Sequence, residues 1–580
     1  MVGWMAPRAV SLALAVAALA LGAPAAVAQT ASQLTPRSFE PQPPGGGATI
    51  VFSGQPGLET PPGAERLTVT VGRVTVDGAF PELDAANKAF VARLAGRRIP
   101  ASEIFAATRA LEAAYAQAGY VLARVVLPQQ QLRNGGSLRI VVVDGFIERA
   151  DVSRVPERVR GRVAAVVAPL VGQRHLTIGV IERRLLIAGD TPGVGLRSAL
   201  SRGTATGATV LTIEGTYSPA YGMIDADNTL ASALGRTTTG VGVDLNSVLG
   251  LGESAYLRVT GHLAGNDQNG LGGLGTDHPR YGALAGGVWM PIGTDGLKFN
   301  LEAVETRATL KAPAAPEFAT VFDRVTALLR YPWIRSRTLD VGTEASFDVE
   351  NETASLVTPI ASLPVWEDAV RVARLSGDVT WHTGWGGTLF AKAILSFGID
   401  AFGARDGTPA LPLSRAGASP DFQKFEALVD YSQPLLPHLA MNLYARGQTS
   451  FGQPLVLAEQ IGLASFQELS TFDAGTLGGD SGWVVRAELN SPWSATLDAV
   501  ALQVVPYAFG ATGMLFLANP SALEHGTVRV SSIGVGVRLG STVVVQGLPQ
   551  AALTLEYGRR FRSDQLPDDN RFTLVSSTRF

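Results

Sequence analysis

The stretch LDVGTEASFDVE, residues 339–350, alternates two kinds of side chain along the chain. One series is apolar or small and comprises Leu339, Val341, Ala345, Phe347 and Val349. The interleaved series is polar or glycine and comprises Asp340, Gly342, Glu344, Ser346, Asp348 and Glu350. A period of two is that of a β-strand whose faces meet different surroundings. Here one face is apolar and the other is charged.

The same alternation recurs in residues 297–304, 424–431 and 483–490, and no helical period replaces it between residues 218 and 580. A soluble β-sandwich also alternates, so the pattern alone leaves two fold classes open. The charged face is typical of a water-filled lumen, and the chain ends on Phe580. We therefore expect a mainly β protein whose residues 218–580 form a transmembrane antiparallel β-barrel, because a closed barrel pairs every backbone group within lipid.

Composition excludes several classes of function. Charged residues make up 17% of the 580 residues and the formal net charge is -3, so no basic field indicates a nucleic-acid partner. The chain has no cysteine, which excludes disulfides, thiolate metal sites and cysteine nucleophiles. The acidic or histidine-containing runs DHPR (277–280) and DADN (225–228) are interpreted as a loop and a strand end. We expect no enzymatic activity, no cofactor and no metal.

The N-terminus has the pattern of a secretory signal peptide over residues 1–28. Arg8 precedes the short apolar run SLALAVAALALG, and Ala26-Val27-Ala28 supplies small residues for cleavage. The apolar run is shorter than the roughly 20 residues that a membrane-spanning helix needs. Residues 29–66 are rich in Pro and Gly and are expected to form a linker. Their opening stretch has too little apolar periodicity for a firm helix inside the barrel, so we expect a weak plug or none.

Two small α/β modules are predicted between the linker and the barrel. Residues 67–145 contain a strand-like stretch LTVTVGRVTV, a helical apolar series and two further strands. Residues 146–217 repeat the order strand, helix, helix, strand, strand. We call them the first and the second module.

The run GDSG at residues 479–482 surrounds the nucleophilic serine in trypsin-like proteases, so Ser481 raises the question of an enzyme. Such catalysis also needs a histidine base and a buried aspartate in a set chain order. None of the six histidines lies in a sequence that resembles that histidine motif. We interpret GDSG as a glycine-rich loop that turns sharply before a strand.

Three longer stretches carry a family resemblance. They are ERRLLIAGDTPGVGLRSAL (182–200), IDADNTLASALGRTTTGVGVDLNSVLGLGESAYLRV (224–259) and AEQIGLASFQELSTFDAGTLGGDSGWVVRAELNSP (458–492). In this order, and with a signal peptide and two modules before a barrel, the chain resembles the two-partner secretion outer-membrane transporters of the haemolysin secretion/activation type.

The resemblance implies a barrel of about 16 strands in the outer membrane of a Gram-negative bacterium, with two polypeptide-transport-associated (POTRA) domains in the periplasm. It implies a secreted exoprotein as partner, recognised by strand addition to the POTRA domains, and the outer-membrane assembly machinery as partner during insertion into the lipid bilayer. Candidate docking strands are 137–145, 194–201 and 207–215. Alternative functions are an outer-membrane protein assembly or insertion factor of the same superfamily, a passive porin, and a surface hydrolase.

The resemblance also implies a loop that folds into the barrel at about 462–482. Its tip residues here are Leu469, Ser470, Thr471, Phe472, Asp473, Gly475, Leu477, Gly479, Asp480 and Gly482. The family pairs a tip arginine with an aspartate in a wall motif of type Phe-x-Asp-x-Gly, which here reads Phe509, Ala511 and Gly513.

Both halves of that ion pair are absent, because the arginine position is Ser470 and the aspartate position is Ala511. Losing both charges together can be close to neutral, whereas losing one would strand the other. We expect the loop still to enter the lumen, held by apolar and backbone contacts around Phe472. The alternative is that the loop has lost the transport-linked conformation.

The C-terminal stretch RFTLVSSTRF resembles a barrel assembly signal. Phe572 and Phe580 share one face of the last predicted strand, while Thr578 replaces an aromatic residue that is common there. We expect a usable but weak signal.

Overall fold

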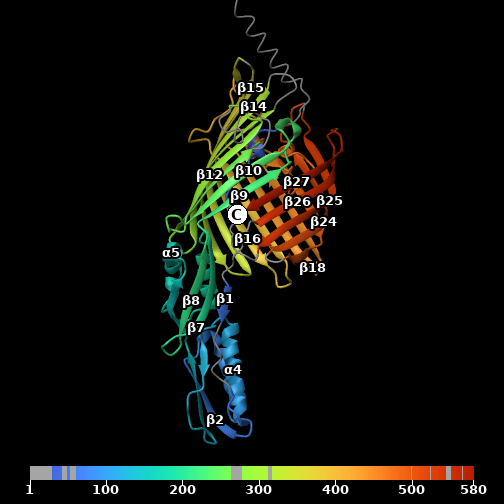
Figure 1. Ribbon diagram of the computed structural model, residues 1–580. Helices are drawn as coiled ribbons and strands as arrows, with labels where there is room; N and C mark the ends of the chain where they lie inside the picture. The colour runs from blue at the N-terminus through green and yellow to red at the C-terminus, as the bar shows by residue number, and fades with distance from the viewer. Residues whose placement is uncertain are drawn as a thin grey trace, which may run out of the picture.

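The computed structural model describes residues 29–41, 49–52, 60–262, 277–310, 317–358, 360–497, 500–522, 524–543, 550–564 and 566–580. The predicted signal peptide at residues 1–28 lies outside the described residues. Figure 1 shows a large barrel with two small modules stacked below one of its rims. We call this the inner rim and the opposite one the outer rim.

The first module is a four-stranded sheet packed against two helices. Its elements are β2 (Thr68–Asp77), η1 (Pro81–Leu83), α3 (Asp84–Leu94), β3 (Arg98–Pro100), α4 (Ala101–Gln117), β4 (Arg124–Val126) and β5 (Gly136–Val143). The sheet order is β3-β2-β5-β4. The apolar series of α4, which includes Leu111 and Tyr115, packs on Leu138 and Ile140 of β5, as its spacing predicted.

The second module repeats the arrangement and gains a strand. Its elements are β6 (Phe146–Arg154), α5 (Glu157–Val167), η2 (Ala168–Leu170), α6 (Ile178–Gly189), β7 (Val194–Arg202) and β8 (Ala208–Tyr217). The sheet order is β1-β7-β8-β6, where β1 (Thr49–Phe52) comes from the segment before the first module. The linker expected at residues 29–66 therefore contributes one strand to a sheet.

The sheet orders change the set of candidate docking strands. β5 lies between β2 and β4, and β8 lies between β7 and β6, so the expected strands 137–145 and 207–215 are interior. β8 is paired with a neighbour on both sides and offers no free edge. On one side of β5, β4 pairs only with Val141–Val143. Of the three candidates, only β7, which contains the whole expected stretch 194–201, lies next to an outer position, and β1 occupies that position.

The rest of the chain forms a closed antiparallel barrel. Within the described residues, its 16 wall strands follow each other in chain order, and the last pairs with the first. They are β9 (Ala220–Asp227), β10 (Thr238–Asn246), β11 (Ser254–Gly261), β12 (Tyr281–Ile292), β13 (Leu297–Leu310), β14 (Glu317–Arg335), β15 (Leu339–Val357), β16 (Ser362–His382), β17 (Thr388–Gly398), β18 (Gln423–Leu436), β19 (Leu439–Thr449), β22 (Ser481–Asn490), β24 (Val500–Phe516), β25 (Thr527–Val543), β26 (Gln550–Arg562) and β27 (Asp569–Arg579). A short strand, β23 (Trp493–Leu497), pairs with β24 at the inner rim, and η3 (Ser232–Leu234) follows β9.

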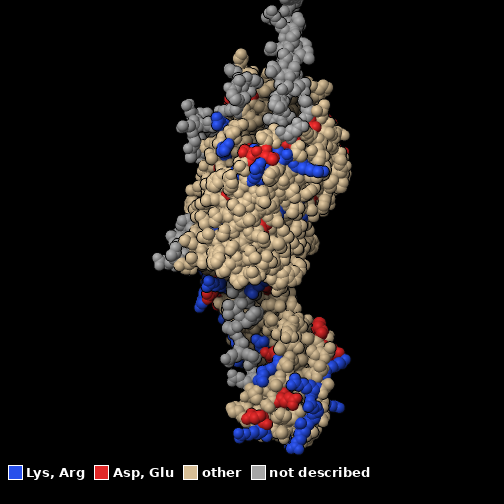
Figure 2. Space-filling view, turned by 90° about the vertical axis from the view of Figure 1, so that its right-hand side faces the viewer, with Lys and Arg blue, Asp and Glu red and all other residues tan. Residues whose placement is uncertain are grey.

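The two faces of the wall match the alternation in the sequence. Asp348 and Glu350 of β15 are buried in the lumen, whereas Leu375 of β16 and Val485 of β22 are exposed on the outside. On the face that Figure 2 shows, charged side chains gather on the modules and near the outer rim, and a broad band of the barrel between them has few charges. The barrel fold predicted from residues 339–350 is thus confirmed. Among the described helices, none has the length and apolar composition to cross a bilayer.

The barrel closes where β27 meets β9. Val575–Arg579 pair with residues 223–227, and the backbone groups of Phe580 and Gly222 bond reciprocally, at 3.0 and 2.8 Å. The Phe580 ring covers Gly222 so closely that no Cβ would fit there. Phe572 and Phe580 are both exposed. The alternate residue Thr573 bonds into the lumen, so the two phenylalanines lie on the lipid face.

Asn228 extends this seam beyond the last strand pair. Its amide nitrogen donates to the Phe572 carbonyl at 3.0 Å, and its amide oxygen accepts the Leu574 N–H at 2.8 Å. Asn228→Ala is expected to lower the heat-denaturation midpoint of the folded barrel, because each lost bond contributes about 0.5–1.5 kcal/mol. Heat-modifiable migration on a gel measures the midpoint. Asn570→Ala, an exposed position on β27 at the other side of this seam, is the control, and equal midpoints for the two variants would contradict this role.

Charged contacts attach the second module to the inner rim. Arg183 of α6 donates to the Pro332 carbonyl at 2.8 Å, and Arg184 donates to the Thr294 carbonyl at 3.1 Å. Asp190, just after α6, accepts from Arg335 of β14 at 2.7 Å. The sheet of the second module is therefore held at the entrance of the lumen.

Candidate functional site

A long loop between β19 and β22 fills much of the lumen. It contains η5 (Leu457–Glu459) and a two-residue hairpin of β20 (Ile461–Gly462) with β21 (Gly478–Gly479). Its apolar residues pack together against the wall strands β22, β24 and β25. They include Ile461, Leu463, Leu469, Phe472 and Leu477, all buried. The loop predicted at about 462–482 thus lies inside the barrel.

The loop tip is also held by charged wall residues. Ser470 donates its hydroxyl to the carboxylate of Glu556 on β26 and accepts a bond from Arg486 of β22 at 2.9 Å. Arg486 in turn lies 2.7 Å from Glu556, and its guanidinium stacks 3.9 Å from the centre of the Phe509 ring. All four side chains are buried. A buried guanidinium that pairs with a carboxylate and lies over an aromatic face satisfies both its charge and its donors.

The position of Ala511 explains how the missing ion pair is replaced. Ala511 lies directly opposite Arg486 in the β22–β24 register and packs into the apolar cluster of the loop. The wall therefore supplies both charges, Arg486 and Glu556, and the tip contributes only the Ser470 hydroxyl. The apolar and backbone contacts expected around Phe472 are thus only part of what holds the tip, because the wall pair Arg486 and Glu556 also binds it.

The remaining tip residues divide between polar and close-packed roles. Asp473 pairs with Arg571 of β27 and lies 3.7 Å from Arg560 of β26. The guanidinium of Arg560 lies 5.7 Å from the centre of the Phe472 ring. Thr471 packs against Gly558, where a Cβ would not fit.

Glycines occupy the positions of the loop and of the wall motif where neighbouring atoms lie closest to the backbone. Gly475 has a positive φ of 72° and lies against Leu34 of the N-terminal segment. Gly482 and Gly513 both lie in the β22–β24 pairing, where the loop packs closely.

The GDSG run has a structural role at the base of the loop. Asp480 is buried and accepts backbone N–H bonds from Leu455 at 2.9 Å and Ala518 at 2.8 Å. Gly479 ends the hairpin with Ile461. Ser481 is the first residue of β22 and accepts the Ser450 N–H at 3.0 Å. The side chain at 481 thus closes a turn, which agrees with the loop interpretation.

Two acidic residues that sequence reasoning missed anchor the other side of the loop. Glu459 is fully buried and lies 2.6 Å from Arg374 of β16 and 2.5 Å from Lys424 of β18. Burial raises the pKa of Glu459, but these two cations outweigh it and hold the pKa well below its ordinary value. Glu468 accepts two bonds from Arg446 of β19, at 2.6 and 3.1 Å. The alternation of side chains along β16, β18 and β19 could have placed Arg374, Lys424 and Arg446 on the lumen face in advance.

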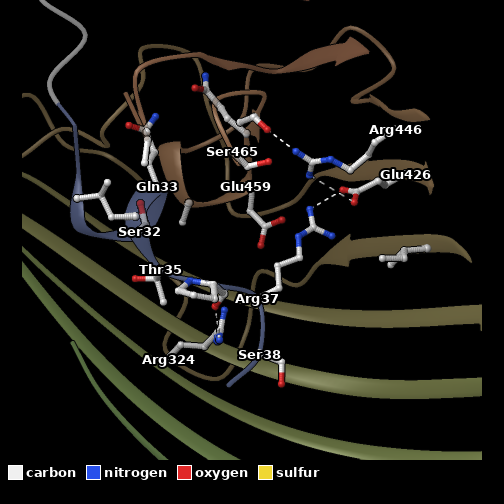
Figure 3. A pocket seen from close by; sticks show the side chains of 18 of the residues that line it. Ser32, Gln33, Thr35, Arg37, Ser38, Arg324, Glu426, Arg446, Glu459 and Ser465 are labelled. Atoms are coloured by element: carbon white, nitrogen blue, oxygen red, sulfur yellow. Dashed lines mark hydrogen bonds and ion pairs between the residues drawn. The ribbon is translucent and has the colours of Figure 1, made fainter. Parts of the chain in front are cut away.

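A segment of the expected linker also enters the lumen. Residues 29–41 contain the single-turn helix α2 (Ala31–Leu34), which is a plug of one turn. Ser32 donates its backbone N–H and its hydroxyl to Glu352 of β15, at 2.9 and 2.6 Å. Arg37 pairs with Glu426 of β18, which Arg446 also approaches (Figure 3). The segment lacks the apolar periodicity of a packed helix. Hydrogen bonds and an ion pair to wall carboxylates help to keep it in the lumen.

A cavity of about 820 Å³ remains between the N-terminal segment, the loop and the wall. Most of the residues that line it are polar or charged, and they carry both signs of charge. It includes Arg37, Glu302, Arg324, Glu344, Arg374, Lys424, Glu426, Arg446, Glu459 and Glu468. In total the cavity carries more acidic than basic side chains, and the N-terminal segment and the loop separate it from the rest of the lumen.

Comparison with known proteins supports this architecture. A family model of the haemolysin secretion/activation proteins ShlB/FhaC/HecB matches residues 207–539, and a model of the ShlB-type POTRA domain matches residues 69–145. The outer membrane transporter CdiB of Escherichia coli O6:K15:H31 is 28% identical over 211 residues, 35% of this chain and 34% of that protein. The match therefore spans about a third of the length of the curated relative.

Two solved structures share the fold over their whole length. CdiB from Escherichia coli aligns with a TM-score of 0.67 at 18% identity, and CdiB from Acinetobacter baumannii aligns with a TM-score of 0.58 at 14% identity; both alignments cover 100% of each chain. The family model covers more than half of this chain. The chain belongs to the ShlB/FhaC/HecB family of haemolysin secretion/activation proteins, and it is an outer-membrane β-barrel protein with POTRA architecture.

Proposed function

We propose that this protein exports an exoprotein across the outer membrane by two-partner secretion. The observation that carries the proposal is a charge-lined lumen closed by two segments of the chain itself. Ion pairs and hydrogen bonds to the wall hold the lumen loop and residues 29–41 beside their apolar contacts. Such contacts can be exchanged for contacts with water or with a passing polypeptide, so both segments can leave without breaking the barrel.

The two modules supply the docking side of the function. They lie below the inner rim, which faces the periplasm in this proposal, and α6 attaches the second module to that rim. Strand addition is the recognition mode that sheet modules of this kind offer to an extended polypeptide. A passive porin has no use for protein-docking modules. The loop also remains in the lumen although Ser470 and Ala511 replace the two charges of the family ion pair. We therefore favour the transport role over loss of the transport-linked conformation.

Deletion of the gene in its native host tests the proposal. Secreted and surface proteins of the deletion strain and of a complemented strain are compared by quantitative mass spectrometry. Loss of one large exoprotein, restored by complementation, is the expected result. A broad fall in other outer-membrane barrels would identify an assembly factor instead. Unchanged profiles in both fractions would overturn the proposal.

A further inference from the structure

The outer edge of the second module is occupied by a strand that is not part of that module. β1 pairs with β7 in parallel, from Thr49 opposite Arg197 to Phe52 opposite Leu200. Without β1, the module would have the order β7-β8-β6 and β7 would be an open edge. An open edge strand is a template for any extended polypeptide. The chain therefore covers its own docking edge with a segment that precedes the first module in the sequence.

The covering strand is short. β1 pairs with four residues of β7, whereas β7 runs from Val194 to Arg202. Among the described residues, no strand lies beside Val194–Leu196 or Ser201–Arg202 on that side. A net backbone hydrogen bond contributes about 0.5–1.5 kcal/mol, and ordering a residue costs about 1–2 kcal/mol. A ladder of this length is therefore weak, and a longer strand on the same edge can replace it.

β1 also limits the movement of the lumenal segment. Only residues 42–48 separate residues 29–41 from β1 in the sequence. Eight chain steps span at most roughly 29 Å when fully extended. While β1 is paired with β7, residue 41 stays within this distance of Thr49, so residues 29–41 cannot withdraw completely from the inner rim. Removal of β1 from β7 lifts this limit.

We propose that an extended segment of the exoprotein replaces Thr49–Phe52 on the outer edge of β7, and that this exchange frees residues 29–41 to leave the lumen. The inference rests on the proposed export function and names its docking edge. Arg197 and Arg202 are exposed on β7, so acidic side chains in the incoming segment are favoured. One strand exchange thereby couples arrival of the cargo to opening of the passage.

A disulfide trap tests the exchange, because the natural chain has no cysteine and only introduced pairs can cross-link. Val51→Cys with Ala199→Cys joins β1 to β7, since these residues are opposite each other. Ala199→Cys with Thr212→Cys is the matched control, because it joins the same residue of β7 to its permanent neighbour β8. Neighbouring strands are close enough for a disulfide, which forms in the oxidising periplasm. Both variants are produced in the native host with and without a thiol reductant.

Export of the exoprotein that the deletion experiment identifies is then measured in the medium. The β1–β7 variant is expected to lose export by at least about tenfold when oxidised and to regain it when reduced, because a tethered strand cannot be displaced by a competitor. The β7–β8 variant is expected to export equally in both states. Full export by the oxidised β1–β7 variant, or equal loss by both oxidised variants, would overturn the inference. If the wild type and the reduced variants export no protein, the proposed function itself fails.

Discussion

Glu459→Ala is expected to release the lumen loop from one side of the wall and to raise the conductance of the barrel. Glu459 is fully buried, and it is the shared partner of Arg374 and Lys424. Without it, Arg374 keeps Asp348 and Glu350, whereas Lys424 has no other salt bridge among the described residues. Removing one partner of a buried ion pair costs about 3–5 kcal/mol, because the remaining charge is left buried without compensation. A difference of 1.4 kcal/mol is a factor of about ten in an equilibrium, so the loop-detached state should gain roughly a hundredfold or more in population.

Single-channel recording in planar bilayers measures this effect as more frequent and larger openings. Glu459→Gln should fall between the wild type and the alanine variant, since the amide keeps the shape and some hydrogen bonds but not the charge. Glu317→Ala, at the outer-rim end of β14, is the control, because its carboxylate takes no part in the loop contacts. Conductance of Glu459→Ala equal to that of this control would show that the ion pairs of Glu459 do not keep the loop in the lumen.

Glu556→Leu is expected to destabilise the barrel and to detach the loop tip. Three donors converge on this carboxylate, from Ser470, Arg486 and Tyr507. Without it, Arg486 keeps only Glu488 as an acidic partner and remains buried, at a cost of about 3–5 kcal/mol. The heat-denaturation midpoint of the folded barrel should fall, and the conductance should rise.

A double-mutant cycle with Arg486→Met isolates the pair. Each single variant leaves one buried charge without its main partner, whereas the double variant replaces both charges by apolar side chains of similar volume. Such double replacement is often close to neutral, so the midpoint of the double variant should lie nearer to the wild type than that of either single variant. Additive losses in the cycle would mean that the two residues do not act together at the tip.

Much of the architecture was predictable because it follows from periodicity. The two-residue period of residues 339–350 places every second side chain on the same face, wherever the strand lies in the barrel. The apolar series of α4 likewise determined which face packs on its sheet. The replacement of the family ion pair by Ser470 and Ala511 was also visible in the sequence, since it depends only on motif alignment.

The partners of these residues were not predictable. Arg486 and Glu556 lie on strands β22 and β26, and the distance between them depends on barrel closure and register rather than on any local pattern. Glu459 and Glu468 are two acids in an irregular loop, and their roles exist only because the loop folds back onto Arg374, Lys424 and Arg446. Residues 29–41 were expected to be linker because their composition is poor in apolar residues. Their bonds to Glu352 and Glu426 come from the wall.

The sequence by itself determined the strand faces, the two modules, the absence of a protease motif around Ser481 and the loss of the tip charge at position 470. These properties are local, because each depends on residues within a few positions of one another. Only the tertiary structure decided which charges meet in the lumen, that β5 and β8 are interior, and that Thr49–Phe52 cover β7. These properties depend on pairing between distant segments, and that pairing is selected by the closure of the barrel and by sheet order as a whole.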